Sequence, residues 1–269
     1  MPFAPAGLIT LTTDFGAAEP FAGIVRGRIL GRFPAARIVD LSHGIPPGRA
    51  DLAGFWLGHA WLEFPPGTVH LAVVDPGVGT SRRVVLAHAA GRLLLAPDNG
   101  LLPEALRGHM DVCWTTMDPA LPARLALLPL SSTFHGRDLF APLAAALASG
   151  ALTPADFGIV AAPRDPAPLP APRHDARGIA GRVILADRFG NLFTNVGAEL
   201  VASFPHPVIS AGGREWPLLP TYGDAPPGAP LALINAFGLL ELALNGRSAA
   251  EAVGLGEGAA VRIGAEMTA

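Results

Sequence analysis

The sequence contains no lysine, a single cysteine and a single tyrosine among its 269 residues. Every basic residue is therefore an arginine, and the arginines form no continuous block, while the formal net charge is −3. This pattern argues against a nucleic-acid partner. The lone Cys113 excludes an intrachain disulfide and a zinc site built from several thiolates. With 50% hydrophobic and 15% charged residues, the composition is typical of a compact globular protein and not of a disordered one.

Long apolar runs and phosphate-binding loops are also missing. The Ala- and Leu-rich stretch 139–152 is too short to span a bilayer, and residues 1–16 lack the basic start of a signal peptide. No Gly-x-Gly-x-x-Gly follows the first expected strand, and no Walker loop occurs. We therefore expect a soluble cytoplasmic protein that does not cradle phosphate.

Apolar periodicity predicts a mostly parallel α/β sheet in the first part of the chain. The expected strands cover 8–13, 37–41, 70–74, 84–88 and 92–96, and the expected helices cover 20–33, 51–64 and 134–148. The last two strands are so closely spaced that we expect them to be antiparallel. Short β-like runs after the connector predict a small all-β domain. The expected organisation is a domain over 1–160, a Pro-rich connector over 161–175 and a second domain over 176–269.

One stretch, Val73 to Arg82, organises the first domain. An apolar strand ends there, Asp75 follows at once, a Pro- and Gly-rich turn comes next, and Arg82 lies seven residues after the Asp. Ligands of open α/β sheets bind at the carboxyl ends of strands, so this Asp and Arg are candidates for chemistry. The alternative, that Asp75 caps the turn and pairs with Arg82, is equally favoured.

Three further carboxylates stand at the ends of expected strands, namely Asp14, Asp40 and Asp98. Several acidic strand ends are typical of a metal site or of a site for a sugar diol, because a carboxylate accepts two hydrogen bonds from vicinal hydroxyls.

Two histidines stand in turns of the first domain. We interpret His43 as an ordinary turn residue, whereas His135 precedes Gly136, Arg137 and Asp138 at a helix start and is a better candidate. Arg137 and Asp138 are expected to pair at that helix N-terminus.

In the second domain the run 187–191 reads as a hairpin turn. Tyr222 lies in a Pro- and Gly-rich loop, where it could stack on a base or be an ordinary surface aromatic.

Seven short motifs, each weak alone, occur together in one order. They are Thr13-Asp14-Phe15-Gly16, Ser42-His43-Gly44-Ile45-Pro46-Pro47, Val74-Asp75-Pro76-Gly77-Val78-Gly79-Thr80, Pro97-Asp98-Asn99-Gly100-Leu101, Phe134-His135-Gly136-Arg137-Asp138, Asp187-Arg188-Phe189-Gly190-Asn191 and Ile234-Asn235. In this combination the chain resembles the S-adenosyl-L-methionine (SAM) hydrolases, or hydroxide adenosyltransferases, which are relatives of fluorinase and chlorinase. The resemblance extends over about residues 8–263.

The resemblance implies an N-terminal α/β, sandwich-like domain, a smaller C-terminal all-β, barrel-like domain, and a homotrimer. SAM would lie between the first domain of one subunit and the second domain of its neighbour. It would be hydrolysed to adenosine and L-methionine without a metal or cofactor. The Asp-Arg-His set that activates water falls here on Asp75, Arg82 and His135.

The resemblance also implies roles in substrate binding. Asp14 would hold the ribose hydroxyls, Asp187 the methionine amine and Asn191 the adenine. Phe189 and Tyr222 would surround the nucleoside, and Asn235 would face the methionine carboxylate.

The chain departs from the family pattern at two positions. Gly48 stands where an aromatic residue is frequent, and Ala236 follows Asn235 where a serine is frequent, so one hydroxyl contact to the methionine carboxylate is missing. These departures concern affinity more than the type of reaction.

Two other functions stay open at this point. One is a SAM or nucleoside sensor without catalysis, which would have no need of the Asp-Arg-His set. The other is a halogenase, but halogenases replace the Asp by a Tyr in a different turn and carry an extra loop, whereas only short turns separate Arg83 from Asp98 here.

Overall fold

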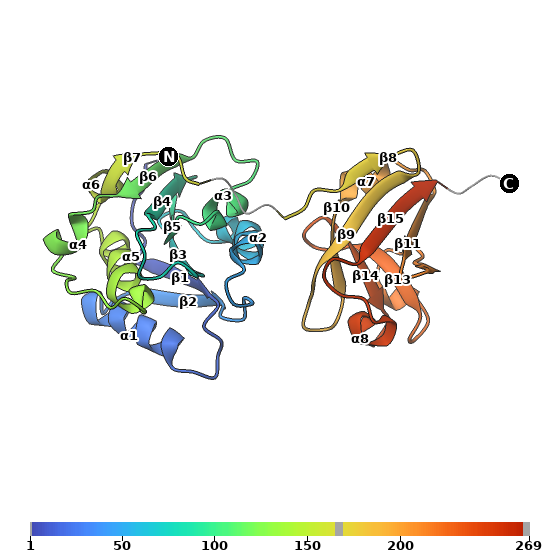
Figure 1. Cartoon of the computed structure of the whole chain (residues 1–269), viewed down its shortest axis with the longest axis horizontal. Helices are drawn as coiled ribbons and strands as arrows, with labels where there is room; N and C mark the ends of the chain where they lie inside the picture. The colour runs from blue at the N-terminus through green and yellow to red at the C-terminus, as the bar shows by residue number, and fades with distance from the viewer. Residues whose placement is uncertain (1, 165–168, 266–269) are drawn as a thin grey trace. The chain divides into compact units, whose positions relative to one another are not determined.

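The computed structural model describes residues 2–164 and 169–265, and it divides into two compact units, Met1–Pro168 and Leu169–Ala269 (Figure 1). The middle of the expected connector, 165–168, lies outside the described residues. The part before it is attached to the first unit, because the backbone N–H of Arg164 donates to buried Asp98 (2.8 Å). Past the gap, Arg173–Asp175 already forms strand β8, which pairs with β9 (Gly178–Ala186) of the second unit.

The first unit is built on a seven-stranded sheet with the order β2-β1-β3-β5-β4-β6-β7. Its strands are β1 (Leu8–Thr13), β2 (Arg37–Ser42), β3 (Val69–Val73), β4 (Val84–Ala89), β5 (Arg92–Pro97), β6 (Cys113–Met117) and β7 (Gly158–Val160). Strands β2, β1, β3 and β5 pair in parallel, and β6 runs with them because it is antiparallel to β4, which is antiparallel to β5. The predicted α/β class with a mostly parallel sheet is confirmed, as is the antiparallel pairing of β4 with β5.

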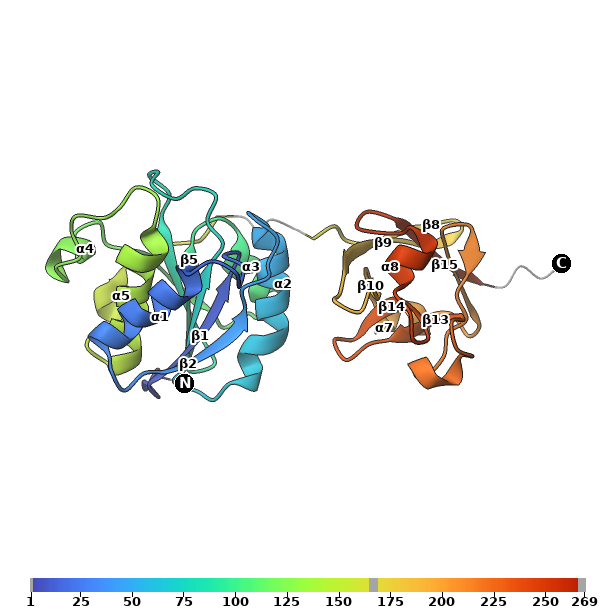
Figure 2. The same cartoon turned by 90° about the horizontal axis from the view of Figure 1, so that it is seen from below.

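Helices cover both faces of this sheet. They are α1 (Phe21–Arg32), α2 (Ala50–Ala60), η1 (Trp61–Glu63), α3 (Leu101–Ala105), α4 (Leu121–Arg124), η2 (Gly136–Phe140), α5 (Ala141–Ser149) and α6 (Pro154–Phe157). Figure 2 shows α1 and α5 on one face and α2 and α3 on the other. Two apolar cores result, one around Leu71 and Phe140 and one around Trp61 and Val74. Strand β3 is buried along its whole length, as its uninterrupted apolar run predicts.

Strands β4 and β5 are joined by a tight β-hairpin, because Ala89 pairs directly with Arg92. Ala90 and Gly91 form its two-residue turn, and both have a positive φ, 46° and 72°. This combination matches a type I′ turn, whose twist suits the flanking strands. The chain therefore carries no inserted loop between these two strands.

The named strands of the second unit pair only in antiparallel fashion, which confirms the predicted all-β class; one isolated bridge, between Leu218 and Ala232, is parallel. Its main path is β12-β11-β15-β9-β10-β14-β13. Besides β8 and β9, the strands are β10 (Leu192–Gly197), β11 (Pro207–Ala211), β12 (Arg214–Glu215), β13 (Pro230–Ile234), β14 (Leu239–Leu244) and β15 (Ala260–Ala265). The sheet curls around a core that contains Trp216, Leu242 and Ile263. Three short helical segments, α7 (Ala198–Ala202), η3 (Tyr222–Asp224) and α8 (Ala249–Val253), interrupt it.

In the part of the chain that the structure describes, no helix is both long and apolar enough to cross a membrane.

Candidate functional site

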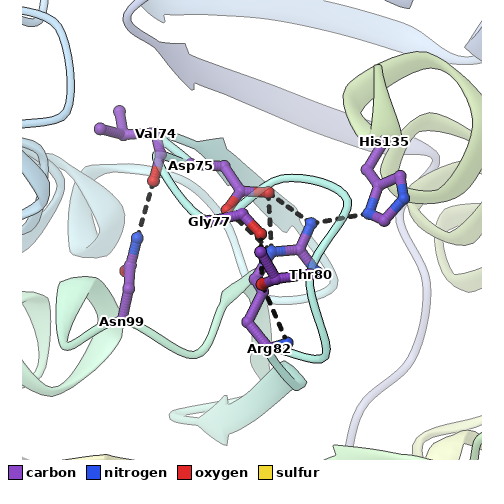
Figure 3. Close-up of polar contacts among 7 residues, drawn as sticks. All are labelled: Val74, Asp75, Gly77, Thr80, Arg82, Asn99 and His135. Carbon is purple, nitrogen blue, oxygen red and sulfur yellow. Dashed lines mark hydrogen bonds and ion pairs between the residues drawn. The ribbon is translucent and has the colours of Figure 1, made fainter. Parts of the chain in front are cut away.

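The turn after β3 brings Asp75 and Arg82 into direct contact. Arg82 Nε donates to Asp75 Oδ1 (2.7 Å) and Oδ2 (2.8 Å), and Nη2 donates to Oδ2 as well (Figure 3). The Arg82 and Asp75 side chains are only 8% and 6% exposed, so the pair is held in a poorly hydrated place. A buried bidentate pair of this kind fixes the orientation of both side chains, whereas its net contribution to the stability of the fold is small. The predicted pairing is therefore present, and it does not exclude the catalytic interpretation, because carboxylate oxygens retain lone pairs for water.

Two further hydrogen bonds and one ring contact orient this turn. The Asn99 side chain donates through Nδ2 to the carbonyl of Val74 (2.8 Å), which holds the end of the strand. Thr80 Oγ1 donates to the Gly77 carbonyl (2.7 Å), and the guanidinium of Arg82 lies 5.3 Å from the centre of the Phe140 ring. The Arg82 side chain is thus fixed by an anion on one side and an aromatic ring on the other.

His135 joins the pair from a segment more than fifty residues later in the chain. Its Nδ1 lies 2.9 Å from Arg82 Nη2. His135 directly precedes the π-helical turn η2, a type of turn that is frequent at functional sites. The two segments can approach because Gly79 has no side chain: a Cβ there would lie 2.1 Å from the carbonyl oxygen of Ser132.

Gly79 is consequently a position where a small change is expected to have a large effect. Gly79 has φ of +78°, so Gly79→Ala should cost at least about 1–2 kcal/mol from backbone strain alone and should also push the Ser132 loop away from Arg82. We expect a lower melting temperature and a loss of turnover. Gly213→Ala is the matched control, because Gly213 has φ of +74° and a Cβ added there would meet nothing within 4 Å. Equal turnover in both variants would contradict the role of the close approach.

The contact with Arg82 defines the state of the His135 ring. A guanidinium has donors and no acceptor, so Nδ1 must carry the lone pair and the neutral ring carries its proton on Nε2. Burial and the neighbouring Arg82 cation lower the pKa of His135 below its usual value, while Asp75 and Asp138 act in the opposite direction. His135 is therefore neutral near pH 7 and has a basic nitrogen inside the cluster.

Asp14 lies in the same cavity as this cluster. A cavity of about 410 Å³ is lined by Asp14, Asp75 and His135, together with Phe15 and Phe134. The backbone N–H of Gly48 donates to Asp14 Oδ2 (2.9 Å), which orients the carboxylate. Three of the predicted residues thus line one cavity. Arg82 contacts two of them, Asp75 and His135.

The second unit has a cavity of its own, of about 610 Å³, and it begins at the hairpin turn between β9 and β10. Asp187 Oδ1 accepts from the backbone N–H of Phe189 (2.9 Å) and of Asn191 (2.8 Å), which confirms the predicted turn. Asn191 is buried, whereas the Phe189 ring is 76% exposed. All three residues line the cavity, so the turn also presents a carboxylate, an amide and a free aromatic face to it.

Tyr222 and Asn235 line the same cavity and are joined by a residue that was not predicted from the sequence. Glu241 accepts from the Tyr222 hydroxyl at Oε1 (2.6 Å) and from Asn235 Nδ2 at Oε2 (3.2 Å). The signal was present, because Glu241 is a single acidic residue inside the apolar strand β14. A charged residue in such a run is either on an exposed face or buried for a reason, and here it is 1% exposed.

Several other candidates line neither cavity and have structural partners instead. Asp40 pairs with Arg26, Asp98 pairs with Arg83, and Asp138 pairs with Arg137, the last as predicted. His43 hydrogen-bonds through Nδ1 to Thr13 (2.8 Å), in keeping with a turn residue. Within residues 2–164 and 169–265, no three His, Cys, Asp or Glu side chains are grouped as metal ligands.

Comparison with protein families assigns both units. Residues 9–158 match the SAM hydroxide adenosyltransferase N-terminal domain, and residues 181–262 match the C-terminal domain of the same family.

Individual relatives agree with this assignment. A protein of Thermus thermophilus named (R)-S-adenosyl-L-methionine hydrolase is 41% identical over 256 residues, which cover 93% of this chain and 97% of that protein. A protein of Actinopolyspora mzabensis named fluorinase is 25% identical over 302 residues, with 95% and 96% coverage. The crystal structure of an uncharacterized conserved protein from Thermotoga maritima superposes with a TM-score of 0.83 at 30% identity, covering 95% of this chain and 99% of that one. The chain therefore belongs to the SAM hydroxide adenosyltransferase family, as its motifs predict.

Proposed function

We propose that this chain is an enzyme that hydrolyses SAM to adenosine and L-methionine. The observation that carries the proposal is the contact of Asp75, Arg82 and His135 at a cavity that also contains Asp14, in a member of this family. The relative named as a hydrolase is markedly more similar than the one named as a fluorinase, and this favours water over halide as the nucleophile.

The proposed reaction is a single displacement at C5′ of the ribose. The oxygen of one water forms a bond to C5′ while the C5′–S bond breaks, and the bonding electron pair returns to sulfur, so that methionine leaves as a neutral thioether. Water is a weak nucleophile near pH 7, so it must be held in line with the breaking bond and lose a proton as it attacks. The reaction balances without a redox partner, which is why we propose no cofactor.

Each residue of the Asp75–Arg82–His135 cluster has a separate role in activating the water. Asp75 orients the water through its remaining lone pairs, and Arg82, which is always cationic, stabilises hydroxide character as it develops. We assign proton acceptance to His135, whose only lone pair is on Nδ1. Because Arg82 occupies Nδ1 in this structure, the assignment requires the water to replace the guanidinium there. The other acceptor within reach is Asp75 itself.

The state of His135 predicts a pH dependence. A base must be unprotonated to act, and since its pKa is lowered, turnover should hold as the pH falls below about 6.5 and be lost only as the pH passes through the lower pKa. Arg82→Gln removes a cation that lowers this pKa and frees Asp75, which raises it, so the His135 pKa should move upward. Titration of the His135 ring signal by NMR measures this, with the exposed His174 as an internal reference. An unchanged or lower midpoint in the variant would contradict the coupling.

The remaining residues are proposed to bind the substrate. Asp14 would accept hydrogen bonds from the ribose hydroxyls, Asp187 would bind the methionine amine and Asn191 the adenine. Phe189 and Tyr222 would pack around the nucleoside, and Asn235 would face the methionine carboxylate. Their support is the family resemblance together with their positions at the two cavities.

We further propose a cytoplasmic homotrimer in which the first unit of one subunit and the second unit of its neighbour form each site. The support is that each unit has a cavity lined by part of the proposed binding set.

Complementation tests the shared site. At limiting SAM, an Asp14→Ala chain and an Asn191→Ala chain should each be much slower than the native chain. Each mixed trimer should regain one native site, because one of its two mixed interfaces joins the two intact halves and the other joins the two altered halves. Mixed trimers that form, as shown by native mass spectrometry of differently tagged chains, and that are no faster than the single variants would refute the arrangement.

The function itself is tested by incubating the protein with SAM and following adenosine by chromatography, with and without halide. Adenosine should form at a rate independent of chloride or fluoride. A 5′-halogenated nucleoside would indicate a halogenase, and stable binding of SAM without any product would indicate a sensor.

A further inference from the structure

The loop after β1, which carries Asp14, is held by the loop after β2. The backbone N–H of Gly16 donates to the carbonyl of His43 (2.8 Å). On the other side of Asp14, the hydroxyl of Thr13 lies 2.8 Å from Nδ1 of the His43 ring. The backbone N–H of Gly48, in the same loop as His43, donates to the Asp14 carboxylate itself (2.9 Å). His43 therefore contacts the chain on both sides of Asp14, once through its backbone and once through its side chain.

The side-chain contact depends on an irregularity in the sheet. The register of β1 against β2 shifts by one residue after Leu11, so that Thr12 stands opposite Ser42. With a regular register Ser42 would instead be level with Thr13, and the shift brings His43 to that level. Such irregularities are rare between parallel strands, and they occur next to active sites, where they change the direction of a side chain.

The His43 ring is held at both of its nitrogens, and its side chain is only 10% exposed. Nε2 lies 3.2 Å from Asp40 Oδ1, and Asp40 is itself paired with Arg26 of α1 (2.7 Å). The Arg26 guanidinium is also near Nε2, but at 3.4 Å it is farther away than the carboxylate. A ring with its proton on Nε2 donates to Asp40 and accepts from the Thr13 hydroxyl, whose oxygen accepts the backbone N–H of Phe15 (3.2 Å).

Of the described residues that line the cavity of about 410 Å³, Asp14 is one and His43 is not. His43 can therefore act on a ligand there only through its neighbours. A carboxylate that accepts from two vicinal hydroxyls must present its oxygens in one direction, which requires a fixed backbone beneath it. We propose that His43 is a positioning residue, which fixes the direction of the Asp14 carboxylate and thereby sets the affinity for the ribose hydroxyls. The inference rests on the proposed function, because it takes Asp14 as the ribose ligand.

Variants at His43 separate its two side-chain contacts. His43→Ala removes both. His43→Asn places an amide near the position of Nδ1 and can keep the bond to Thr13, whereas His43→Gln places its amide near the position of Nε2 and can keep only the bond to Asp40. Ser42→Ala is the matched control, because Ser42 Oγ accepts the backbone N–H of Gly44 within its own loop (3.1 Å).

The experiment is calorimetric titration of the full-length protein with adenosine and with 2′,3′-dideoxyadenosine, which lacks both ribose hydroxyls. His43→Ala and His43→Gln should bind adenosine about three- to tenfold more weakly, the size expected for one hydrogen bond. Both variants should bind dideoxyadenosine within about twofold of the native protein, because this ligand has no hydroxyls for Asp14 to hold. His43→Asn and Ser42→Ala should stay within about twofold of the native protein for both ligands.

A second measurement tests whether His43 acts through Asp14. In a protein that already carries Asp14→Ala, the further change His43→Ala should not weaken adenosine binding any more, because the carboxylate that it positions is gone. If His43→Ala does not fold, as judged from its melting curve, His43→Gln takes its place in this comparison.

Three results would each overturn the inference: equal weakening or no weakening of the two nucleosides, a loss that persists in the Asp14→Ala protein, or adenosine binding by His43→Asn no stronger than by His43→Gln. His43 would then only support the fold. Since neither nucleoside is turned over, the titration is independent of the product assay. A protein that forms adenosine from SAM but weakens both nucleosides equally would refute the positioning alone. Selective weakening in a protein that forms no adenosine would refute the hydrolase function alone.

Discussion

Turnover of SAM is expected to fall about 10²–10⁴-fold when His135 is replaced by alanine, the usual size of the loss of a general base. The same range is expected for Asp75→Ala and Arg82→Ala, because the three side chains are in contact and act on one water. Affinity for the substrate should change much less, since these groups face the nucleophile and not the bulk of the ligand. Single-turnover rates and binding constants, measured separately, distinguish the two effects.

Combining the changes tests whether the cluster acts as a unit. The double variant Asp75→Ala with His135→Ala should lose little more than the worse single variant, because groups that share one step are not additive. His174→Ala is the control, since this histidine is exposed on β8 and is not among the residues that line either cavity. Fully multiplicative losses in the double variant would mean that the two residues act in separate steps.

Binding of the nucleoside is expected to depend on Asp14 instead. Asp14→Ala removes a carboxylate proposed to bridge two ribose hydroxyls, and each such charge-assisted bond contributes roughly 1.5–3 kcal/mol. The affinity for adenosine should therefore fall by at least about tenfold. Titration with adenosine measures this, and Asp118→Ala serves as the control because Asp118 pairs with Arg124 at the surface. Unchanged affinity in the Asp14 variant would remove this residue from the site.

The sequence was most informative where one local pattern was sufficient. The apolar run before Asp75 predicts a buried strand, and the strand is buried along its length. The Asp75–Arg82 contact and the 187–191 turn were predictable because each lies within a few residues of chain. Short elements such as α3 and β6 were not predicted. The five residues of α3 make little more than one helical turn, and Cys113–Met117 shows neither a continuous apolar run nor an alternation of apolar and polar residues.

Contacts between segments that are distant in the sequence could not be predicted from local hydrophobic periodicity or turn motifs. His135 meets Arg82 only because Gly79 lets two loops touch, and nothing local at either position indicates that approach. The family resemblance, and not the periodicity, placed these residues together. Glu241 was missed for a related reason: its partners Tyr222 and Asn235 lie on other segments, so the sequence did not show that this acid is buried against a cavity.

The central claim is that water attacks C5′ of SAM at the Asp75–Arg82–His135 cluster, and the source of the product's oxygen tests it most directly. The reaction should be run in oxygen-18 water and the adenosine analysed by mass spectrometry. The 5′-oxygen of adenosine should carry the label, at a rate that His135→Ala lowers by at least about 100-fold. Adenosine without label at that oxygen, or native turnover no faster than that of the His135 variant, would contradict the proposed mechanism.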